Sequence, residues 1–248
     1  MAPKHQAVLA QALRIPATNK LSGKRVILAS NSPRRKEILK TCGLRPEIVP
    51  STFKEDLAHS SFADVHEYPV ATATQKAVEV YERLVTEQPE DGPDLVIGAD
   101  TVVLTHHPGS SSADAGFSDP EARPEILEKP TSKVDNLRML LELNGGVCEI
   151  VTGVCLVYPI LTAPGYAIKS LDERTLVHFA DNSRELLEAY ADSGEGLDRA
   201  GGFAIQGLGG LLVSKIDGDY NNVVGFPAAS FFKLLDLLVE EEDDFLDV

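Results

Sequence analysis

The stretch Val-Ile-Leu-Ala-Ser-Asn-Ser-Pro-Arg-Arg, residues 26–35, sets the pattern for the whole chain. Its apolar first part predicts a buried strand that ends at Ala29, and the small polar residues after it predict a sharp connection. Ser32 and Pro33 are typical of a helix N-cap followed by proline in the first turn. Gly43 stands where that helix would end in a left-handed residue. A strand followed directly by a helix favours an α/β fold.

Two arginines, Arg34 and Arg35, occupy the first turn of this helix, where the helix dipole favours acids and disfavours cations. One interpretation is a phosphate cradle, in which an anion lies against free backbone N–H groups with guanidinium groups around it. The alternative is that both arginines lie in solvent or pair with surface acids. This stretch alone leaves both interpretations open.

The composition is that of an ordinary soluble protein, because 43% of the 248 residues are hydrophobic and 25% are charged. The net charge of −15 argues against a nucleic-acid polymer as a partner, since phosphate backbones need a basic surface. No apolar run is long enough to predict a membrane partner. The three cysteines, Cys42, Cys148 and Cys155, show no metal-ligand spacing and favour a reducing, cytoplasmic compartment.

Strands alternate with helices between residues 25 and 239, and we expect a single catalytic domain there. Residues 1–24 are expected to form a frayed leader. Residues 105–124 are rich in Ser, Pro, Gly and Asp and predict a surface-loop insertion. Residues 159–165 predict a second insertion. The acidic tail, residues 240–248, is expected to lie in solvent.

A second segment, residues 94–104, places Asp100 between two apolar, β-branched runs. A carboxylate in that position is costly unless it is paired or bound to a metal, which indicates a functional site. The alternative is an aspartate at a strand end that caps a turn. A helix is predicted over residues 69–84, with Lys76 on the face next to its apolar stripe.

A third segment, residues 194–207, is dense in glycine. Glycines permit positive φ angles and close approach of the backbone to a ligand. They form no dinucleotide fingerprint here, and the chain has no Gly-Lys-Ser or Gly-Lys-Thr sequence of the kind that ends a P-loop. The segment alone is weak evidence, and ordinary turns explain such sequences more often.

Taken together, these segments resemble the Maf family of house-cleaning nucleoside triphosphate pyrophosphatases, over about residues 25–238. The resemblance implies an elongated mixed β-sheet flanked by helices, with two lobes and a central cleft. It implies a nucleoside triphosphate as substrate, a divalent metal and a homodimer, and the additional loops would fit a eukaryotic member. The matching segments are, in order, residues 30–35, 98–101, 128–130, 152–154, 201–207 and 222–227.

The resemblance also implies roles for individual residues. Asp100 matches the proposed catalytic base, and Lys76 and Lys129 match active-site lysines. Thr101 and Gln206 match positions linked to base preference. The set of Arg34, Thr101 and Gln206 resembles the branch acting on dTTP and UTP rather than the branch acting on 7-methyl-GTP. The substrate-binding residues implied by the first motif are Ser30, Ser32, Arg34, the motif arginine, and Arg35.

The chemistry of these side chains agrees with that implication. Cleavage between the α and β phosphates develops negative charge on pyrophosphate, which positioned cations and a metal stabilise. Hard oxygen ligands suit Mg²⁺ or Mn²⁺, and we predict Asp100 and Glu55 as metal ligands. Asp56 lies beside Glu55 in the sequence, and the alternative for Glu55 is an ordinary exposed acid of a loop. The Gln206 amide offers a donor and an acceptor that suit the edge of uracil or thymine. Two other functions stay open: a pyrophosphatase for another nucleotide, and a nucleotide-binding module without catalysis.

Overall fold

The computed structural model describes residues 5–106, 124–242 and 244–247. The chain divides into two compact units. The first unit comprises Met1–Asp100, Thr152–Glu173 and Gly225–Val248, and the second comprises Thr101–Val151 and Arg174–Val224. The two lobes with a central cleft stay a prediction.

The described residues form a mixed sheet of seven strands in the order β2-β1-β3-β5-β6-β7, with β4 paired to β3. Strand β1 lies parallel to β2 and β3, whereas β4 is antiparallel to β3 and β7 is antiparallel to β6. The predicted α/β fold with a mixed sheet is therefore confirmed. The strands are β1 (Val26–Leu28), β2 (Glu47–Ile48), β3 (Leu95–His106), β4 (Ile126–Leu127), β5 (Val147–Pro159), β6 (Tyr166–Phe179) and β7 (Val213–Asp217).

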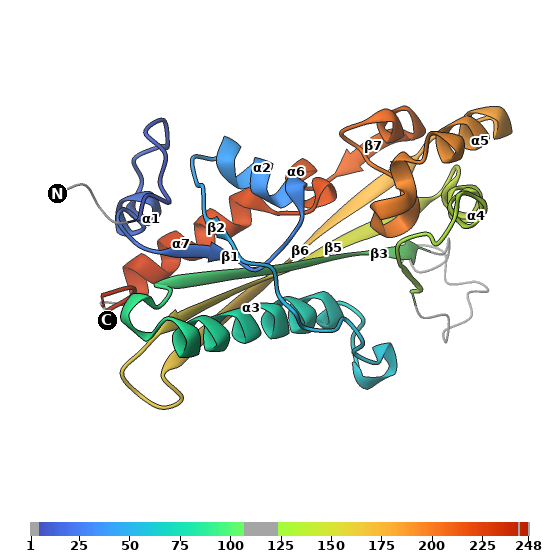
Figure 1. The fold of residues 1–248 in the computed structure, drawn as a ribbon. Helices are drawn as coiled ribbons and strands as arrows, with labels where there is room; N and C mark the ends of the chain where they lie inside the picture. Colours follow the sequence, from blue (N-terminus) through green and yellow to red (C-terminus); the bar gives the residue numbers. More distant parts are fainter. Residues whose placement is uncertain (1–4, 107–123, 243, 248) are drawn as a thin grey trace. The chain divides into compact units, whose positions relative to one another are not determined.

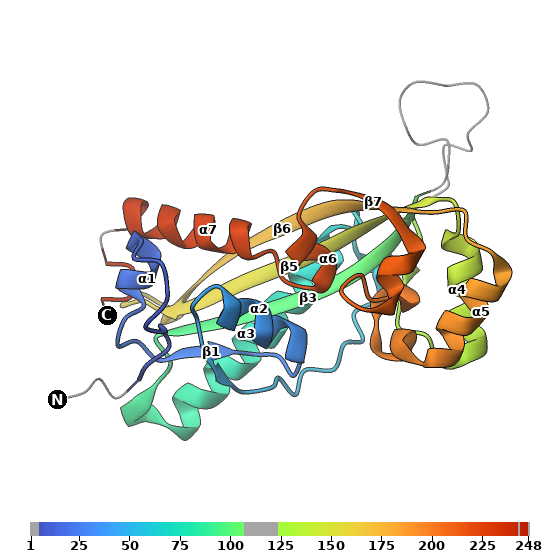
Figure 2. The same ribbon diagram turned by 90° about the horizontal axis from the view of Figure 1, so that it is seen from above.

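Helices flank the sheet in both units. In the first unit, α3 covers one face of the sheet while α2 and α7 lie on the other face (Figure 1). In the second unit, α4 and α5 pack side by side (Figure 2). The α-helices are α1 (Pro16–Lys20), α2 (Pro33–Thr41), α3 (Glu67–Glu87), α4 (Lys133–Leu143), α5 (Arg184–Ser193), α6 (Tyr220–Val224) and α7 (Ala228–Glu241). The short 3₁₀ helices are η1 (His59–Ser61), η2 (Pro89–Asp91), η3 (Glu195–Asp198), η4 (Ala200–Gly202) and η5 (Leu208–Leu212).

Each unit has its own hydrophobic core. The core of the first unit joins Ile27 and Val96 of the sheet to Ala73 and Val80 of α3. The core of the second unit joins β3 and β5 to α4 and α5, and the rings of Phe179 and Phe203 meet edge to face with centroids 5.0 Å apart. Burial on this scale is the main stabilising contribution to a fold of this size.

The strand and helix predicted from residues 26–43 are confirmed. The Ser32 side chain accepts a hydrogen bond from the backbone N–H of Arg35 at 3.5 Å, and proline opens α2. Gly43 has a φ of +91°, and a Cβ there would lie 2.5 Å from the Cβ of Ala12. Glycine is thus required at this position both by its backbone angle and by the chain packed over it.

The prediction of a frayed leader is wrong for the described residues 5–24. Leu9 donates a backbone hydrogen bond to the Gly43 carbonyl at 2.8 Å, and Arg45 donates to the Ala7 carbonyl at 2.7 Å. The backbone N–H of Ala17 at the start of α1 donates to Asp236 of α7 at 2.9 Å. These partners lie far away in the sequence, so the local pattern of the leader could not reveal them.

The acidic tail is also more ordered than predicted. Phe245 and Leu246 are each 1% exposed, and the ring of Phe245 meets Tyr158 edge to face at 4.9 Å. Glu242 accepts a hydrogen bond from the Tyr158 hydroxyl at 2.6 Å and pairs with Lys169 at 2.6 Å. The prediction of a solvated tail is therefore wrong for Phe245 and Leu246, whose apolar side chains anchor the tail to the first unit. Glu240, Glu241, Asp244 and Asp247 are exposed, as predicted.

Two element boundaries differ from those predicted. Helix α3 spans Glu67–Glu87 rather than residues 69–84. Strand β3 continues to His106, and residues 107–123 of the expected surface loop lie outside the described residues. None of the described helices is long and apolar enough to cross a membrane.

Candidate active site

A buried ion pair forms the centre of the candidate site in the first unit. Nζ of Lys76 on α3 lies 2.8 Å from Oδ1 of Asp100 on β3, and the two residues are 7% and 8% exposed. The close approach of α3 to β3 depends on Gly98, where a Cβ would lie 2.2 Å from the carbonyl oxygen of Ala73. Gly98 and Asp100 share one face of the strand, and Ala73 and Lys76 are one helical turn apart. The contact at Gly98 therefore places Lys76 beside Asp100.

The position of Asp100 decides between the two interpretations of residues 94–104. It lies within β3, not at a strand end, so the turn-capping alternative is wrong and the expected charged partner is present. Burial raises the pKa of the Asp100 carboxyl above its ordinary value, while the positive charges of Lys76 and Arg35 oppose that rise. A carboxylate with a raised pKa is a better proton acceptor near neutral pH than an ordinary one.

Glu55 joins the same cluster from a loop. Its Oε1 lies 2.9 Å from Nζ of Lys76, although the Glu55 side chain is 56% exposed. The lysine ammonium therefore contacts two carboxylates, one from the loop and one from the sheet. The neighbouring Asp56 is exposed. The structure thus places Glu55, the first of the two candidates, beside Asp100.

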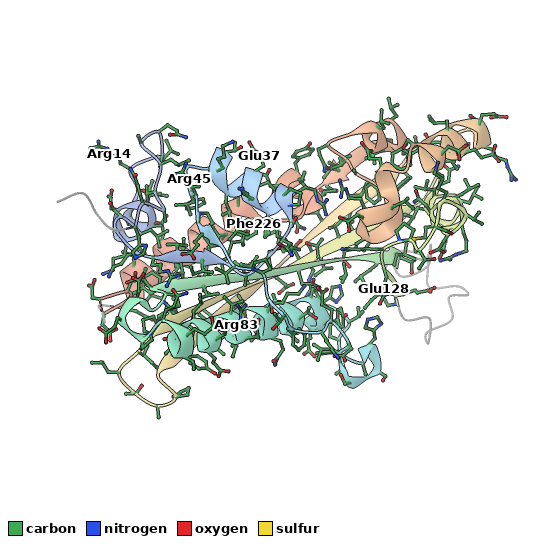
Figure 3. The ribbon with its side chains drawn as sticks, viewed as in Figure 1. Arg14, Glu37, Arg45, Arg83, Glu128 and Phe226 are labelled. Carbon is green, nitrogen blue, oxygen red and sulfur yellow. The ribbon has the colours of Figure 1, made fainter. Side chains whose placement is uncertain are left out.

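A carboxylate on α3 fixes the start of that loop. Glu79 accepts hydrogen bonds from the Ser51 hydroxyl at 2.7 Å, and from the backbone N–H of Thr52 at 3.0 Å and its hydroxyl at 2.9 Å. Arg83, labelled in Figure 3, donates to Glu79 at 2.7 Å and to the Pro50 carbonyl at 2.9 Å. Sequence reasoning missed Glu79, because only its spacing from Arg83 is visible in the sequence and its loop partners are not.

Arg35 lies next to this cluster and faces inward. Its guanidinium donates to the Ser30 hydroxyl at 3.1 Å and to the Gly225 carbonyl at 3.0 Å. The alternative of a solvated or surface-paired arginine is therefore wrong for Arg35. Burial lowers the pKa of Arg35, while the charges of Asp100 and Glu55 oppose that shift.

The polar connection before α2 gathers the remaining residues of the first motif. The backbone N–H of Ser32 donates to the Ser30 hydroxyl at 3.2 Å, and Ser30 is 9% exposed. Arg34 is partly buried in the first turn of α2. Together with Arg35, these residues surround the N-terminus of a nine-residue helix, which is a favourable place for an anion.

The other predicted site residues belong to the second unit. Thr101 follows Asp100 directly in β3, and Gln206 is exposed in the loop before η5. Nζ of Lys129 lies 2.9 Å from Oδ1 of Asp198, and the lysine side chain is 65% exposed. The approach of Lys129 and Gln206 to the cluster of the first unit stays a prediction.

The glycine-rich segment serves packing within the second unit at two positions. Gly201 and Gly202 have φ angles of +67° and +74°. A Cβ on Gly202 would lie 2.2 Å from Nδ2 of Asn136, which donates to the Gly202 carbonyl at 2.7 Å. A Cβ on Gly201 would lie 2.8 Å from Val103. These two glycines are therefore explained by the protein's own contacts, as the alternative of ordinary turns suggested.

The carboxylates of the first unit also fit a divalent metal. Among the described residues, no group of three or more His, Cys, Asp or Glu side chains could hold a metal ion. Mg²⁺, however, is commonly bound through one or two carboxylates together with substrate phosphates and water. Asp100 and Glu55, which contact the same lysine ammonium, are a donor set of that kind.

The fold and the site together define an α/β protein with a basic, carboxylate-bearing cluster beside the N-terminus of a helix. The family model described as Maf-like protein matches residues 25–238. The chain therefore belongs to the Maf family, and the resemblance of its motifs is confirmed.

Curated relatives cover most of the chain. A human protein named probable bifunctional dTTP/UTP pyrophosphatase/methyltransferase is 45% identical over 224 residues, which is 89% of this chain and 33% of the relative. The dTTP/UTP pyrophosphatase of Schizosaccharomyces pombe is 40% identical over 90% of this chain and 87% of its own length. That of Thermococcus kodakarensis is 37% identical over 86% of this chain and 96% of its own length. The chain thus spans about a third of the human relative and most of the other two.

Proposed function

We propose that this chain hydrolyses dTTP and UTP to the nucleoside monophosphate and pyrophosphate, and so removes these nucleotides from the pool. The observation that carries the proposal is the Lys76–Asp100 pair, with Glu55 and Arg35 beside it at the N-terminus of α2. The names of three relatives, which are 37–45% identical to this chain, support the same substrates.

Asp100 is the proposed base. It orients a water molecule and accepts one proton from it as the water oxygen bonds to the α-phosphorus. The bond between the α-phosphorus and the bridging oxygen breaks, and the electron pair leaves with pyrophosphate. Burial, which raises the pKa of Asp100, brings the carboxylate closer to the working pH of a general base.

The cationic side chains stabilise the charge that develops on pyrophosphate. We assign this role to Arg34, Arg35, Lys76 and Lys129, with Ser30 and Ser32 as further donors to phosphate oxygens. Each charge-assisted hydrogen bond contributes roughly 1.5–3 kcal/mol. A few such bonds offset the repulsion between a triphosphate and a protein with a net charge of −15, because that repulsion is screened beyond about 8–10 Å.

A divalent cation, Mg²⁺ or Mn²⁺, is part of the proposal. When bound, it would polarise the phosphate oxygens as a Lewis acid, with Glu55 and Asp100 as its protein ligands. Lys76 contacts both carboxylates and so holds them near each other.

We assign base selection to Thr101 and Gln206. The Gln206 amide carries one acceptor and two donors, which match the N3–H and O4 groups of uracil and thymine. A Gln206→Glu variant should lose its preference for dTTP and UTP, because its carboxylate offers no N–H for O4. Unchanged preference in that variant would count against the assignment.

The test of the function is pyrophosphate release from a panel of dTTP, UTP, dCTP, ATP, GTP, inosine triphosphate and 7-methyl-GTP, with Mg²⁺ and with Mn²⁺. We expect the highest kcat/KM for dTTP and UTP. Release from purine nucleotides instead would keep the reaction and overturn the base assignment. Binding of dTTP without any release would favour the binding module.

We place the protein in the cytoplasm, since the buried Cys148 and Cys155 are free thiols. We also propose a homodimer, as the family resemblance implies. Sedimentation equilibrium tests that assembly, and a monomer at all concentrations would contradict it.

A further inference from the structure

Two side chains, those of Tyr190 and Glu195, accept hydrogen bonds from the backbone on either side of Gln206. We call residues 203–210 the Gln206 loop. The backbone N–H of Leu208 donates to Oε1 of Glu195 at 3.1 Å, and that of Gly209 donates to Oε2 of the same carboxylate at 3.1 Å. On the other side of Gln206, the backbone N–H of Ala204 donates to the Tyr190 hydroxyl at 3.0 Å.

The two pinning side chains are linked to each other. Tyr190 is 4% exposed on α5, and its pKa is raised by burial and then by the negative charge and hydrogen bond of Glu195. The Tyr190 hydroxyl therefore donates to Glu195 while it accepts from Ala204. One carboxylate and one hydroxyl thus receive three backbone N–H groups from a short loop, and each side chain supports the other.

The packing of the loop leaves little freedom around these bonds. A Cβ on Gly207, the residue after Gln206, would lie 2.1 Å from Oε1 of Glu195. A Cβ on Gly209 would lie 2.7 Å from the backbone nitrogen and oxygen of Ala204. Glycine at both positions lets the carboxylate and the returning chain reach the backbone, so the two ends of the loop are held close together.

We infer that Glu195 and Tyr190 are positioning residues for base selection, which they exert by fixing the backbone of Gln206. This inference rests on the proposed function. A side-chain amide discriminates between bases only when its donor and acceptor are held at fixed positions. An amide that can move binds the correct base less well and adapts to the wrong base, so the difference between the two kcat/KM values becomes smaller. Neither residue needs to touch the nucleotide for this effect.

The test compares Glu195→Gln and Tyr190→Phe with wild type. The first change replaces one carboxylate oxygen by an amide N–H group that cannot accept a hydrogen bond, and the second removes the hydroxyl between Glu195 and Ala204. We expect the ratio of kcat/KM for dTTP to kcat/KM for dCTP to fall about tenfold in each variant. The matched control is Glu188→Gln, since Glu188 pairs with Arg184 on the exposed face of α5, the helix that carries Tyr190. This variant should leave the ratio unchanged.

A second readout needs no catalysis. Amide hydrogen exchange at Ala204, Leu208 and Gly209 should quicken in Glu195→Gln while exchange in α4 stays as in wild type. Quickened exchange with an unchanged discrimination ratio would overturn the inference. So would unchanged exchange, or unfolding of the whole second unit in both variants, because the two residues would then serve the fold and not the loop. A wild-type protein without pyrophosphate release would defeat the proposed function, whereas the exchange result would still report on the pinning itself.

Discussion

Lys76 and Asp100 form an ion pair of 2.8 Å between α3 and β3, and both side chains are nearly inaccessible to solvent. Burial raises the pKa of Asp100, and the charge of Lys76 is the largest contribution that opposes the rise. The pair therefore sets the pH at which the carboxylate is ionised and able to accept a proton.

This relationship predicts how the pH profile responds to loss of the lysine. In Lys76→Met the pKa of Asp100 should rise further, so the acid limb of log kcat/KM for dTTP should move to higher pH. Activity at pH 7 should also fall by about tenfold or more, because a charge-assisted contact of roughly 1.5–3 kcal/mol is lost. Lys40→Met, which removes a half-exposed lysine paired with Glu37, is the matched control. An acid limb that stays in place would contradict the coupling.

The contact between Gly98 and Ala73 predicts a second effect. In Gly98→Ala the new methyl group would meet the Ala73 carbonyl at 2.2 Å, so α3 has to move away from β3. We expect a loss of about 1–3 kcal/mol in the free energy of unfolding, as for other overpacked sites, and a fall in kcat as Lys76 leaves Asp100. Gly92→Ala is the control, since a Cβ there meets nothing within 4 Å. Thermal melts and initial rates measure both effects, and a variant with wild-type rate and melting temperature would refute the packing argument.

Glu79 predicts a pH dependence of stability. Partial burial raises its pKa, but hydrogen bonds from Arg83, Ser51 and Thr52 outweigh burial and lower the pKa to about 2. Because the folded state binds the proton less tightly than the unfolded state, Glu79 contributes stability above its ordinary pKa of about 4.3. That contribution is lost as the pH falls toward 2. The melting temperature of Glu79→Gln should lie below that of wild type at pH 7, and the gap should shrink progressively below about pH 4.3. A gap of constant size down to pH 3 would show that the charge of Glu79 does not hold the loop.

Local sequence signals explain why part of this structure was predictable. The buried run before Ala29, the Ser32 cap and the turn at Gly43 each depend on neighbouring residues, and each was predicted correctly. A carboxylate between two apolar runs is buried only at a high cost unless a charged or hydrogen-bonding partner lies beside it. The sequence therefore predicted that Asp100 is paired, although it did not identify the partner.

The predictions that failed concern segments whose structure depends on contacts between residues far apart in the sequence. The leader gains its order from Gly43 and Asp236, and the tail from Tyr158, and no local periodicity encodes such partners. The Gly225 carbonyl that accepts from Arg35 is likewise 190 residues away in the chain. Glu79 and Glu195 look like ordinary charged residues in the sequence, because their partners are mostly backbone N–H and hydroxyl groups of loops.

The proposed reaction depends above all on Asp100, which accepts the proton from the attacking water. The most direct test is pyrophosphate release from dTTP and UTP by wild type and Asp100→Asn, with Asp217→Asn as a control that removes an exposed aspartate paired with Lys215. We expect release by wild type and by the control, and a loss of about a hundredfold or more in kcat for Asp100→Asn, a typical contribution of general-base catalysis. Wild-type turnover in a folded Asp100→Asn variant would show that Asp100 is not the base.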